Sequence, residues 1–208
     1  MKSMRYLLAE AARIIREGGV VIYPTETVYG IGCDPFNEKA VERIMELKKR
    51  EGKPHPILCS SLDDVYRVAR PMEEELWLAS ILWPGPVTIV MEKTPDLPEI
   101  VTSSLPNVGV RIPANLIVLE LIRMAGTPIV GTSANISGGM SPASLDMVPK
   151  SLREGADMVI DGGVTYYGEP STVVRLAGGG VRVVREGVVK KAELAKILLS
   201  RGYGTLED

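Results

Sequence analysis

The chain contains few of the side chains on which most enzyme chemistry depends. Among its 208 residues there are one histidine, one phenylalanine and two cysteines. Cys33 and Cys59 have neither CxxC nor metal-ligand spacing, so the sequence predicts two buried thiols in a reducing compartment instead of a disulfide framework or a zinc site. Any Ser–His–Asp or Cys–His mechanism would have to use His55, and no motif in the sequence supports such an arrangement.

The chain also lacks a large excess of charge of one sign and a long apolar run. The formal net charge is -2, which excludes a protein that coats nucleic acid non-specifically but leaves a local basic groove open. No stretch approaches the ~20 apolar residues of a membrane span. The N-terminus carries Glu10 and Arg13 where a signal peptide would be apolar. We therefore expect a cytoplasmic protein that does not associate with membranes.

Hydrophobic residues make up 45% of the chain, enough for a sizeable core in one domain, residues 1–208. Strand and helix patterns intermix without a strict βαβ rhythm, which predicts an α/β fold with a mixed sheet and helices packed on it. Helical periodicity lies at 1–19, 37–50, 61–69, 72–83, 114–126 and 190–202. Strand patterns lie at 20–24, 56–60, 87–93, 108–113, 128–135, 156–163, 171–176 and 181–187, the last two forming a hairpin over 177–180.

Common nucleotide-binding and hydrolase motifs are absent, including the phosphate-binding GxxxxGK[ST] loop, HExxH and GxSxG. Polar side chains instead follow two strand ends, at 25–27 and 131–135. Hydroxyls and amides beside glycine suit phosphate and ribose recognition, although ordinary turns use the same residues. Because ligands tend to lie beyond the carboxyl ends of parallel strands, we expect Thr27 and Ser133 to meet in one crevice.

Basic residues supply a second signal. Lys48, Lys49 and Arg50 end a predicted helix, where they suit either an anionic ligand or the helix dipole. Arg111 interrupts an apolar strand pattern and needs a partner, either a carboxylate or phosphate ligand or an internal salt bridge. Ser171 and Arg185 lie at the ends of later strands and fit the same crevice.

Six motifs occur in an order that resembles the YrdC-like family of threonylcarbamoyl-adenylate synthases: PTETVYGIG, the K-x-R at Lys48 to Arg50, GVRIP, TSANISG, PSTVV and VVREG. The resemblance covers about residues 18–187. It implies a twisted open α/β sheet with a concave, basic cavity. Members make L-threonylcarbamoyl-adenylate and pyrophosphate from L-threonine, bicarbonate and ATP, for the modification of adenosine 37 in tRNA. Longer members carry an extra C-terminal domain, and we expect the short form without it here.

The resemblance also implies roles for individual residues. Thr27, Arg111, Gly131 and Ser171 are expected to bind threonine, and Lys48, Arg50 and Ser133 are expected to be catalytic. Mg²⁺ is expected to arrive with ATP, without metal ligands from the protein. The partners implied are tRNA and the tRNA threonylcarbamoyl-transferase complex. ATP is expected to be bound by Lys48, Arg50, His55, Ser133, Asn135, Ser141 and Arg185.

Several positions depart from the family pattern. Glu51 follows Arg50 where many members have proline, Ser60 replaces a histidine and Asn107 a threonine. These departures leave a YciO-like sister branch open. Two other functions also stay open: a module that binds double-stranded RNA or tRNA without this activity, and the carbamoyl-adenylate chemistry of a related hydrogenase-maturation domain. The role of Glu26, as turn cap or ligand-orienting group, is not decided by the sequence.

Overall fold

The computed structural model describes residues 3–49, 52–177, 180–200 and 206–207, and the strands in these ranges form two sheets. The smaller sheet has the strand order β7-β2-β1-β8. β1 pairs antiparallel with β2 and parallel with β8, so the sheet is mixed. Its strands are β1 (Val21–Tyr23), β2 (Gly30–Gly32), β7 (Thr132–Ser133) and β8 (Met158–Val159).

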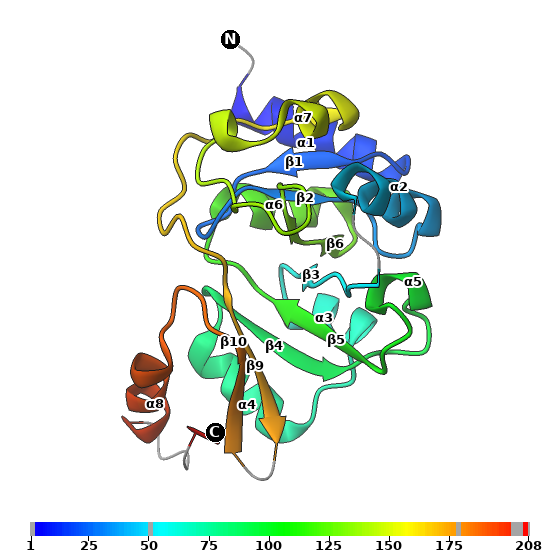
Figure 1. The fold of residues 1–208 in the computed structure, drawn as a ribbon. Helices are drawn as coiled ribbons and strands as arrows, with labels where there is room; N and C mark the ends of the chain where they lie inside the picture. The colour runs from blue at the N-terminus through cyan, green and yellow to red at the C-terminus, as the bar shows by residue number, and fades with distance from the viewer. Residues whose placement is uncertain (1–2, 50–51, 178–179, 201–205, 208) are drawn as a thin grey trace.

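The larger sheet has the order β11-β10-β9-β4-β5-β3-β6 and is also mixed, because β4 runs parallel to β9 but antiparallel to β5. In Figure 1 this sheet lies below the smaller one. Its strands are β3 (Ile57–Leu58), β4 (Val87–Glu92), β5 (Asn107–Arg111), β6 (Ile129–Val130), β9 (Thr172–Ala177), β10 (Gly180–Arg185) and β11 (Leu206–Glu207).

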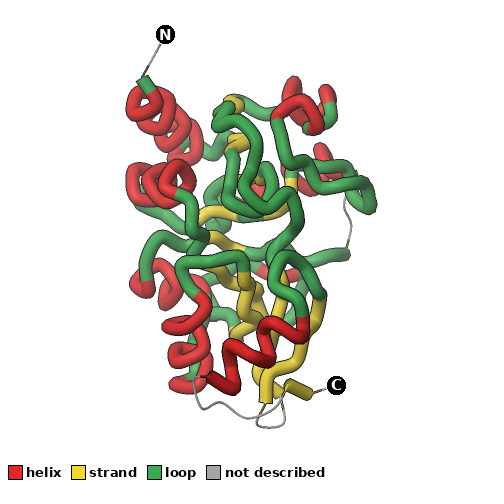
Figure 2. The backbone as a smooth tube through the Cα atoms, turned by 90° about the vertical axis from the view of Figure 1, so that its left-hand side faces the viewer, coloured by secondary structure: helices red, strands yellow, loops and turns green. Residues whose placement is uncertain are grey.

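The helices surround the sheets, and Figure 2 shows several of them gathered along one side of the molecule. No helix in the described part of the chain is long and apolar enough to cross a membrane. The helices are α1 (Met4–Arg16), α2 (Glu38–Lys48), α3 (Leu62–Val68), α4 (Glu73–Leu82), α5 (Glu99–Thr102), α6 (Leu116–Ala125), α7 (Lys150–Gly155), α8 (Lys191–Ser200) and a 3₁₀ turn, Leu145–Met147.

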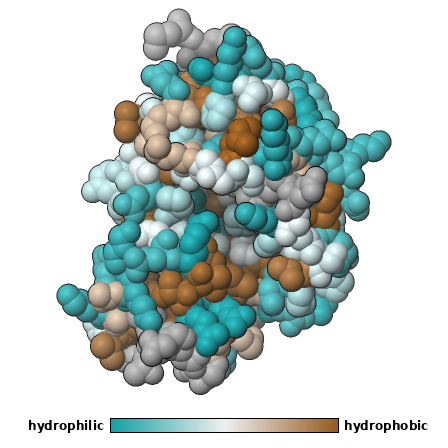
Figure 3. Space-filling model, in the orientation of Figure 1, coloured by the Kyte–Doolittle hydropathy of each residue, from teal (hydrophilic) through white to brown (hydrophobic). Residues whose placement is uncertain are grey.

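The side chains of β1 point alternately into two hydrophobic clusters of the core. Val21 and Tyr23 belong to a hydrophobic cluster that includes the buried faces of α1 and α6. Ile22 points to the opposite face and joins the larger cluster. Because successive strand residues point to opposite faces, this three-residue strand contributes side chains to both clusters. Outside the core, Figure 3 shows hydrophobic side chains gathered over the lower sheet on the front face.

The expected mixed α/β class is confirmed, but several details of the strand prediction were wrong. Residues 30–32, expected in a loop, form β2 and pair with β1. The strand expected at 128–135 is divided between the two sheets, because β6 pairs with β3 and β7 pairs with β2. Between them lies Gly131, where a Cβ would stand 2.4 Å from Leu58 Cγ. The chain crosses between the sheets where only glycine fits. Two short helices, α5 and α7, were missed.

One buried tyrosine links the two sheets at this crossing. The Tyr23 hydroxyl on β1 donates a hydrogen bond of 2.8 Å to the Val130 carbonyl on β6. Burial raises the pKa of Tyr23, so the phenol stays protonated and can donate. A side chain at Gly32 would meet this same carbonyl, since its Cβ would lie 2.1 Å from Val130 O.

We predict that Tyr23→Phe lowers the free energy of unfolding by about 1–3 kcal/mol, because the Val130 carbonyl loses its buried donor. Urea unfolding followed by circular dichroism measures this. Tyr66→Phe is the control, since Tyr66 is 52% exposed. Equal stability of the two variants would show that the hydroxyl does not link the sheets.

Candidate functional site

A cavity of about 100 Å³ lies where the two sheets meet. Thr27 and Ser133 line it from the smaller sheet, as expected from their strand-end positions. Arg111 and Arg185 line it from the larger sheet. The structure thus brings together these predicted site residues: Thr27, Arg111, Gly131, Ser133, Ser141, Ser171 and Arg185.

Arg111 forms a buried ion pair at this cavity. Its Nη1 lies 2.7 Å from Glu26 Oε1, and both side chains are only 6% exposed. The same nitrogen donates to Thr27 Oγ1 over 3.3 Å. Burial lowers the pKa of Arg111 and the Glu26 carboxylate counteracts that effect. Of the two partners considered for Arg111, the internal salt bridge is therefore present, and Arg111 also lines the cavity.

Thr25 shapes the turn that presents Thr27. Its Oγ1 accepts hydrogen bonds from the backbone N–H of Thr27 and Val28, at 3.1 and 3.2 Å, as in a hydroxyl-capped turn. The same hydroxyl donates to the Val28 carbonyl and lies 2.7 Å from Thr27 Oγ1. With Thr27 donating to Thr25, a consistent chain of hydrogen bonds runs from Arg111 through both hydroxyls to the backbone. This chain fixes the Thr27 hydroxyl.

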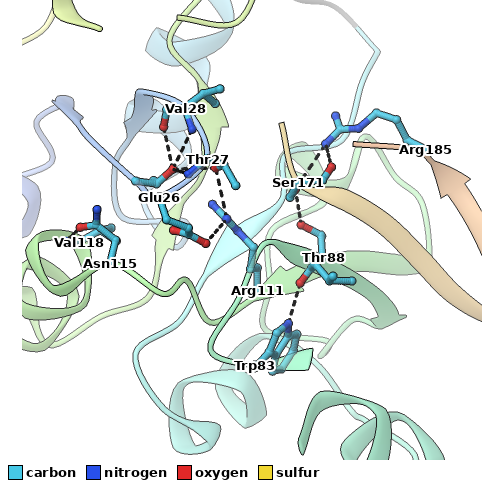
Figure 4. A network of polar contacts seen from close by, with 12 residues as sticks. Glu26, Thr27, Val28, Trp83, Thr88, Arg111, Asn115, Val118, Ser171 and Arg185 are labelled. Atoms are coloured by element: carbon cyan, nitrogen blue, oxygen red, sulfur yellow. Dashed lines mark hydrogen bonds and ion pairs between the residues drawn. The ribbon is translucent and has the colours of Figure 1, made fainter. Parts of the chain in front are cut away.

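The opposite wall is built around Ser171. Its Oγ lies 2.9 Å from Thr88 Oγ1 on β4, and its carbonyl accepts 2.7 Å from Arg185 Nη2 on β10. Partial desolvation of the guanidinium lowers the pKa of Arg185, and the nearby charge of Arg111 lowers it further. Figure 4 shows Arg111 between Glu26 and Thr27 on one side and Thr88 and Ser171 on the other. The described lining residues include two arginines and no acidic side chain, and Glu26 pairs with one of these arginines, Arg111, from behind the lining.

Lys48 and Asn135 shape the site without lining the cavity. The Lys48 ammonium is buried and donates to the Ser133 carbonyl and, over 2.7 Å, to the Asn135 carbonyl. Asn135 accepts 2.5 Å from Ser133 Oγ and donates 2.7 Å to the Gly139 carbonyl. Both residues hold the end of β7, at Ser133, and the loop that follows it. Their expected contacts with ATP stay predictions.

The remaining expected residues are not among the lining residues of the cavity or lie outside the described residues. His55 is buried, and its backbone N–H donates 2.8 Å to the Val101 carbonyl. Its expected contact with ATP also stays a prediction. Arg50 and Glu51 lie outside the described residues, so their expected roles have no structural account here. Ser60 donates from its hydroxyl to Asp64 Oδ2 over 2.7 Å, which ties it to α3.

The sequence analysis did not identify Thr88 as a site residue and did not decide the role of Glu26. Thr88 is a threonine within the apolar strand pattern VTIVME and is 3% exposed, which is a signal of a buried polar contact. Glu26 is also buried but gives no such signal, because the preceding residues already indicate the end of a strand.

A second cavity, of about 340 Å³, lies beside the first. Glu26 lines this cavity and its chain neighbour Thr27 lines the first, so the Glu26–Arg111 pair stands in the wall between them. Asn115, which caps the N-terminus of α6 through its Oδ1, also contributes to the second cavity. The other lining residues are Pro24, Thr25, Ala114, Gly162, Val164, Thr165, Tyr166 and Tyr167.

Comparison with known proteins decides the family. Residues 13–187 match the Sua5/YciO/YrdC family model, whose description reads "Telomere recombination". The chain belongs to this family. Members of the Sua5/YciO/YrdC family thus share the region that contains the cavity residues Thr27 to Arg185.

Individual relatives are similar in sequence to nearly the whole of this chain. The threonylcarbamoyl-AMP synthase of Pyrococcus abyssi is 40% identical over 190 residues, which cover 90% of this chain and 56% of the relative. The Bacillus subtilis threonylcarbamoyl-AMP synthase is 34% identical over 92% of this chain and 56% of its own length. The chain therefore spans about half the length of these curated relatives.

A solved structure of Pyrococcus abyssi Sua5 complexed with L-threonine has the same fold. It superposes with a TM-score of 0.90 and is 37% identical, over 100% of this chain and 61% of that chain. The family, the expected fold class and the resemblance in sequence motifs agree.

We predict that Lys48→Met lowers the free energy of unfolding by about 1.5–3 kcal/mol, because two loop carbonyls lose a charged donor. Methionine keeps the apolar stem of the side chain. Lys39→Met on the exposed face of α2 is the control. Chemical denaturation of both variants gives the comparison, and no difference between them would mean that Lys48 does not hold the loop.

Proposed function

We propose that this chain is an L-threonylcarbamoyl-adenylate synthase that uses L-threonine, bicarbonate and ATP and releases pyrophosphate. The observation that carries the proposal is the cavity between the sheets, which is lined by Thr27, Arg111, Ser133, Ser171 and Arg185. In support, relatives named threonylcarbamoyl-AMP synthase match about nine tenths of the chain, and one homologous structure is a complex with L-threonine.

Threonine would be bound by the residues around Arg111. The guanidinium suits the substrate carboxylate, since arginine binds planar anions through parallel N–H donors. The hydroxyls of Thr27 and Ser171 lie on opposite sides of Arg111 and suit the substrate's hydroxyl and amine. Gly131 lines the same cavity and would contribute its backbone to the threonine site.

ATP would lie toward Ser133, Ser141 and Arg185, with Lys48, Arg50, His55 and Asn135 as the further expected contacts. The threonine amine adds to CO₂ or bicarbonate to give a carbamate, whose oxygen then attacks the α-phosphorus as pyrophosphate leaves. Charge builds on the phosphoryl oxygens during this step. Guanidinium groups and fixed hydroxyl donors stabilise that charge, so positioning and electrostatics account for most of the catalysis.

Mg²⁺ would accompany the ATP phosphates. Within the described ranges, no group of three or more His, Cys, Asp or Glu side chains lies close enough together to hold a metal ion. The proposal therefore assigns no protein ligand to Mg²⁺ and no step to a protein-bound metal. The product would pass in the cytoplasm to the tRNA threonylcarbamoyl-transferase complex, for modification of adenosine 37 of tRNA. We further propose that residues 1–208 form one domain.

The direct test incubates purified protein with ATP, labelled bicarbonate and single amino acids, and measures pyrophosphate release. We expect release that depends on threonine, with the label retained in an adenylate. Pyrophosphate formed without preference for threonine would contradict the proposal. Tight binding of double-stranded RNA or tRNA at moderate salt without ATP turnover would favour the RNA-binding alternative instead.

We predict that Ser133→Ala and Arg185→Met each lower kcat/KM for pyrophosphate release at least ~10-fold, since a lost charge-assisted hydrogen bond costs about 1.5–3 kcal/mol. Arg175→Met is the matched control, because Arg175 lies exposed on the neighbouring strand β9. Rates near wild type in both site variants would remove these two residues from the site.

A further inference from the structure

The carboxylate of Glu26 is an unusual feature of the proposed threonine site. One of its oxygens, Oε1, lies 2.7 Å from Arg111 Nη1, and the whole side chain is 6% exposed. The other oxygen, Oε2, is buried and has no hydrogen-bond partner among the described residues. A buried charge needs compensation. Arg111 supplies it here, so the position of each group depends on the other.

Glu26 also changes the charge that a ligand meets. The described lining of the smaller cavity contains two cations, Arg111 and Arg185, and no acidic residue. Glu26 stands behind Arg111, in the wall shared with the larger cavity. Its negative charge cancels that of Arg111 and leaves about one uncompensated positive charge, on Arg185.

We propose that Glu26 is a positioning and specificity-determining residue for the amino-acid substrate. Its carboxylate holds Arg111 against the cavity and reduces the positive charge there, so that the site accepts an amino acid with one carboxylate and disfavours one with a second anionic group. The inference rests on the proposed function in that it takes an amino acid to occupy this cavity.

Aspartate is the informative competitor. It resembles threonine in size, but it carries a side-chain carboxylate where threonine has a hydroxyl and a methyl group. A like charge several ångströms away, in a site of low effective dielectric, is enough to disfavour aspartate by about tenfold. Serine is the neutral reference, since it differs from threonine by the methyl group alone.

The experiment is isothermal titration of L-threonine, L-serine and L-aspartate into wild type and variants. Glu26→Gln keeps an oxygen that accepts from Arg111 but removes the charge. We expect its preference for serine over aspartate to fall at least ~10-fold relative to wild type. Glu26→Asp retains the charge and should retain the preference. Glu75→Gln is the matched control, because Glu75 is also buried but accepts from the backbone N–H of Met72, the residue that precedes α4.

A purely structural role gives a different result. If Glu26 only supports the fold, Glu26→Gln weakens binding of all three amino acids by the same factor and leaves the ratio unchanged, which would overturn the proposal. Wild type alone provides a second test that needs no variant. Wild-type protein that binds aspartate as tightly as serine would also overturn it.

Failure of the proposed function is recognised separately. If wild type binds no amino acid and releases no threonine-dependent pyrophosphate, the synthase proposal fails, and inorganic sulfate then decides the role of Glu26. Sulfate affinity at least ~10-fold higher in Glu26→Gln than in wild type and Glu75→Gln would support charge compensation at the cavity. Equal sulfate affinities would refute it.

Discussion

The site depends on the buried ion pair between Arg111 and Glu26. Breaking a buried pair by removing one partner typically costs about 3–5 kcal/mol, whereas replacing both partners with apolar groups is often neutral. Such a pair therefore contributes little net stability. Its effect here is on geometry and charge, because it holds a guanidinium at the cavity. This guanidinium donates directly to the Thr27 hydroxyl, from which the hydrogen-bond chain continues to Thr25.

The junction of the two sheets gives this pair its surroundings. The chain crosses from one sheet to the other at Gly131, where the side chain of Leu58 leaves no room for a Cβ. Tyr23 bonds across the same junction to Val130. Strand ends from both sheets thus converge, and their polar side chains face one cavity. Gly131 is therefore explained by the lack of space where the chain crosses between the sheets. The polar side chains at the strand ends are explained by the cavity that they line.

Much of the site was predictable because its residues follow or interrupt apolar strand patterns. Thr27 follows a strand, Arg111 interrupts one and Arg185 ends one, and the structure brings all three together. The residues that support the site are less visible in sequence. Glu26 lies 85 residues from its partner Arg111, and no local pattern reveals a pairing over that separation. Likewise, a lysine at a helix end has the same sequence signature whether it faces a ligand or loop carbonyls, as Lys48 does. The sequence did not predict that the strand at 128–135 is divided at Gly131, because the residues on both sides of Gly131 have strand patterns.

A crystal structure of this protein with L-threonine tests the central claim most directly. The account predicts the amino acid in the cavity between the sheets, with its carboxylate on the Arg111 guanidinium, its hydroxyl or amine near Thr27 and Ser171, and the Arg111–Glu26 pair intact. Threonine bound instead in the neighbouring cavity near Asn115 and Tyr166, without contact to Arg111, would contradict it.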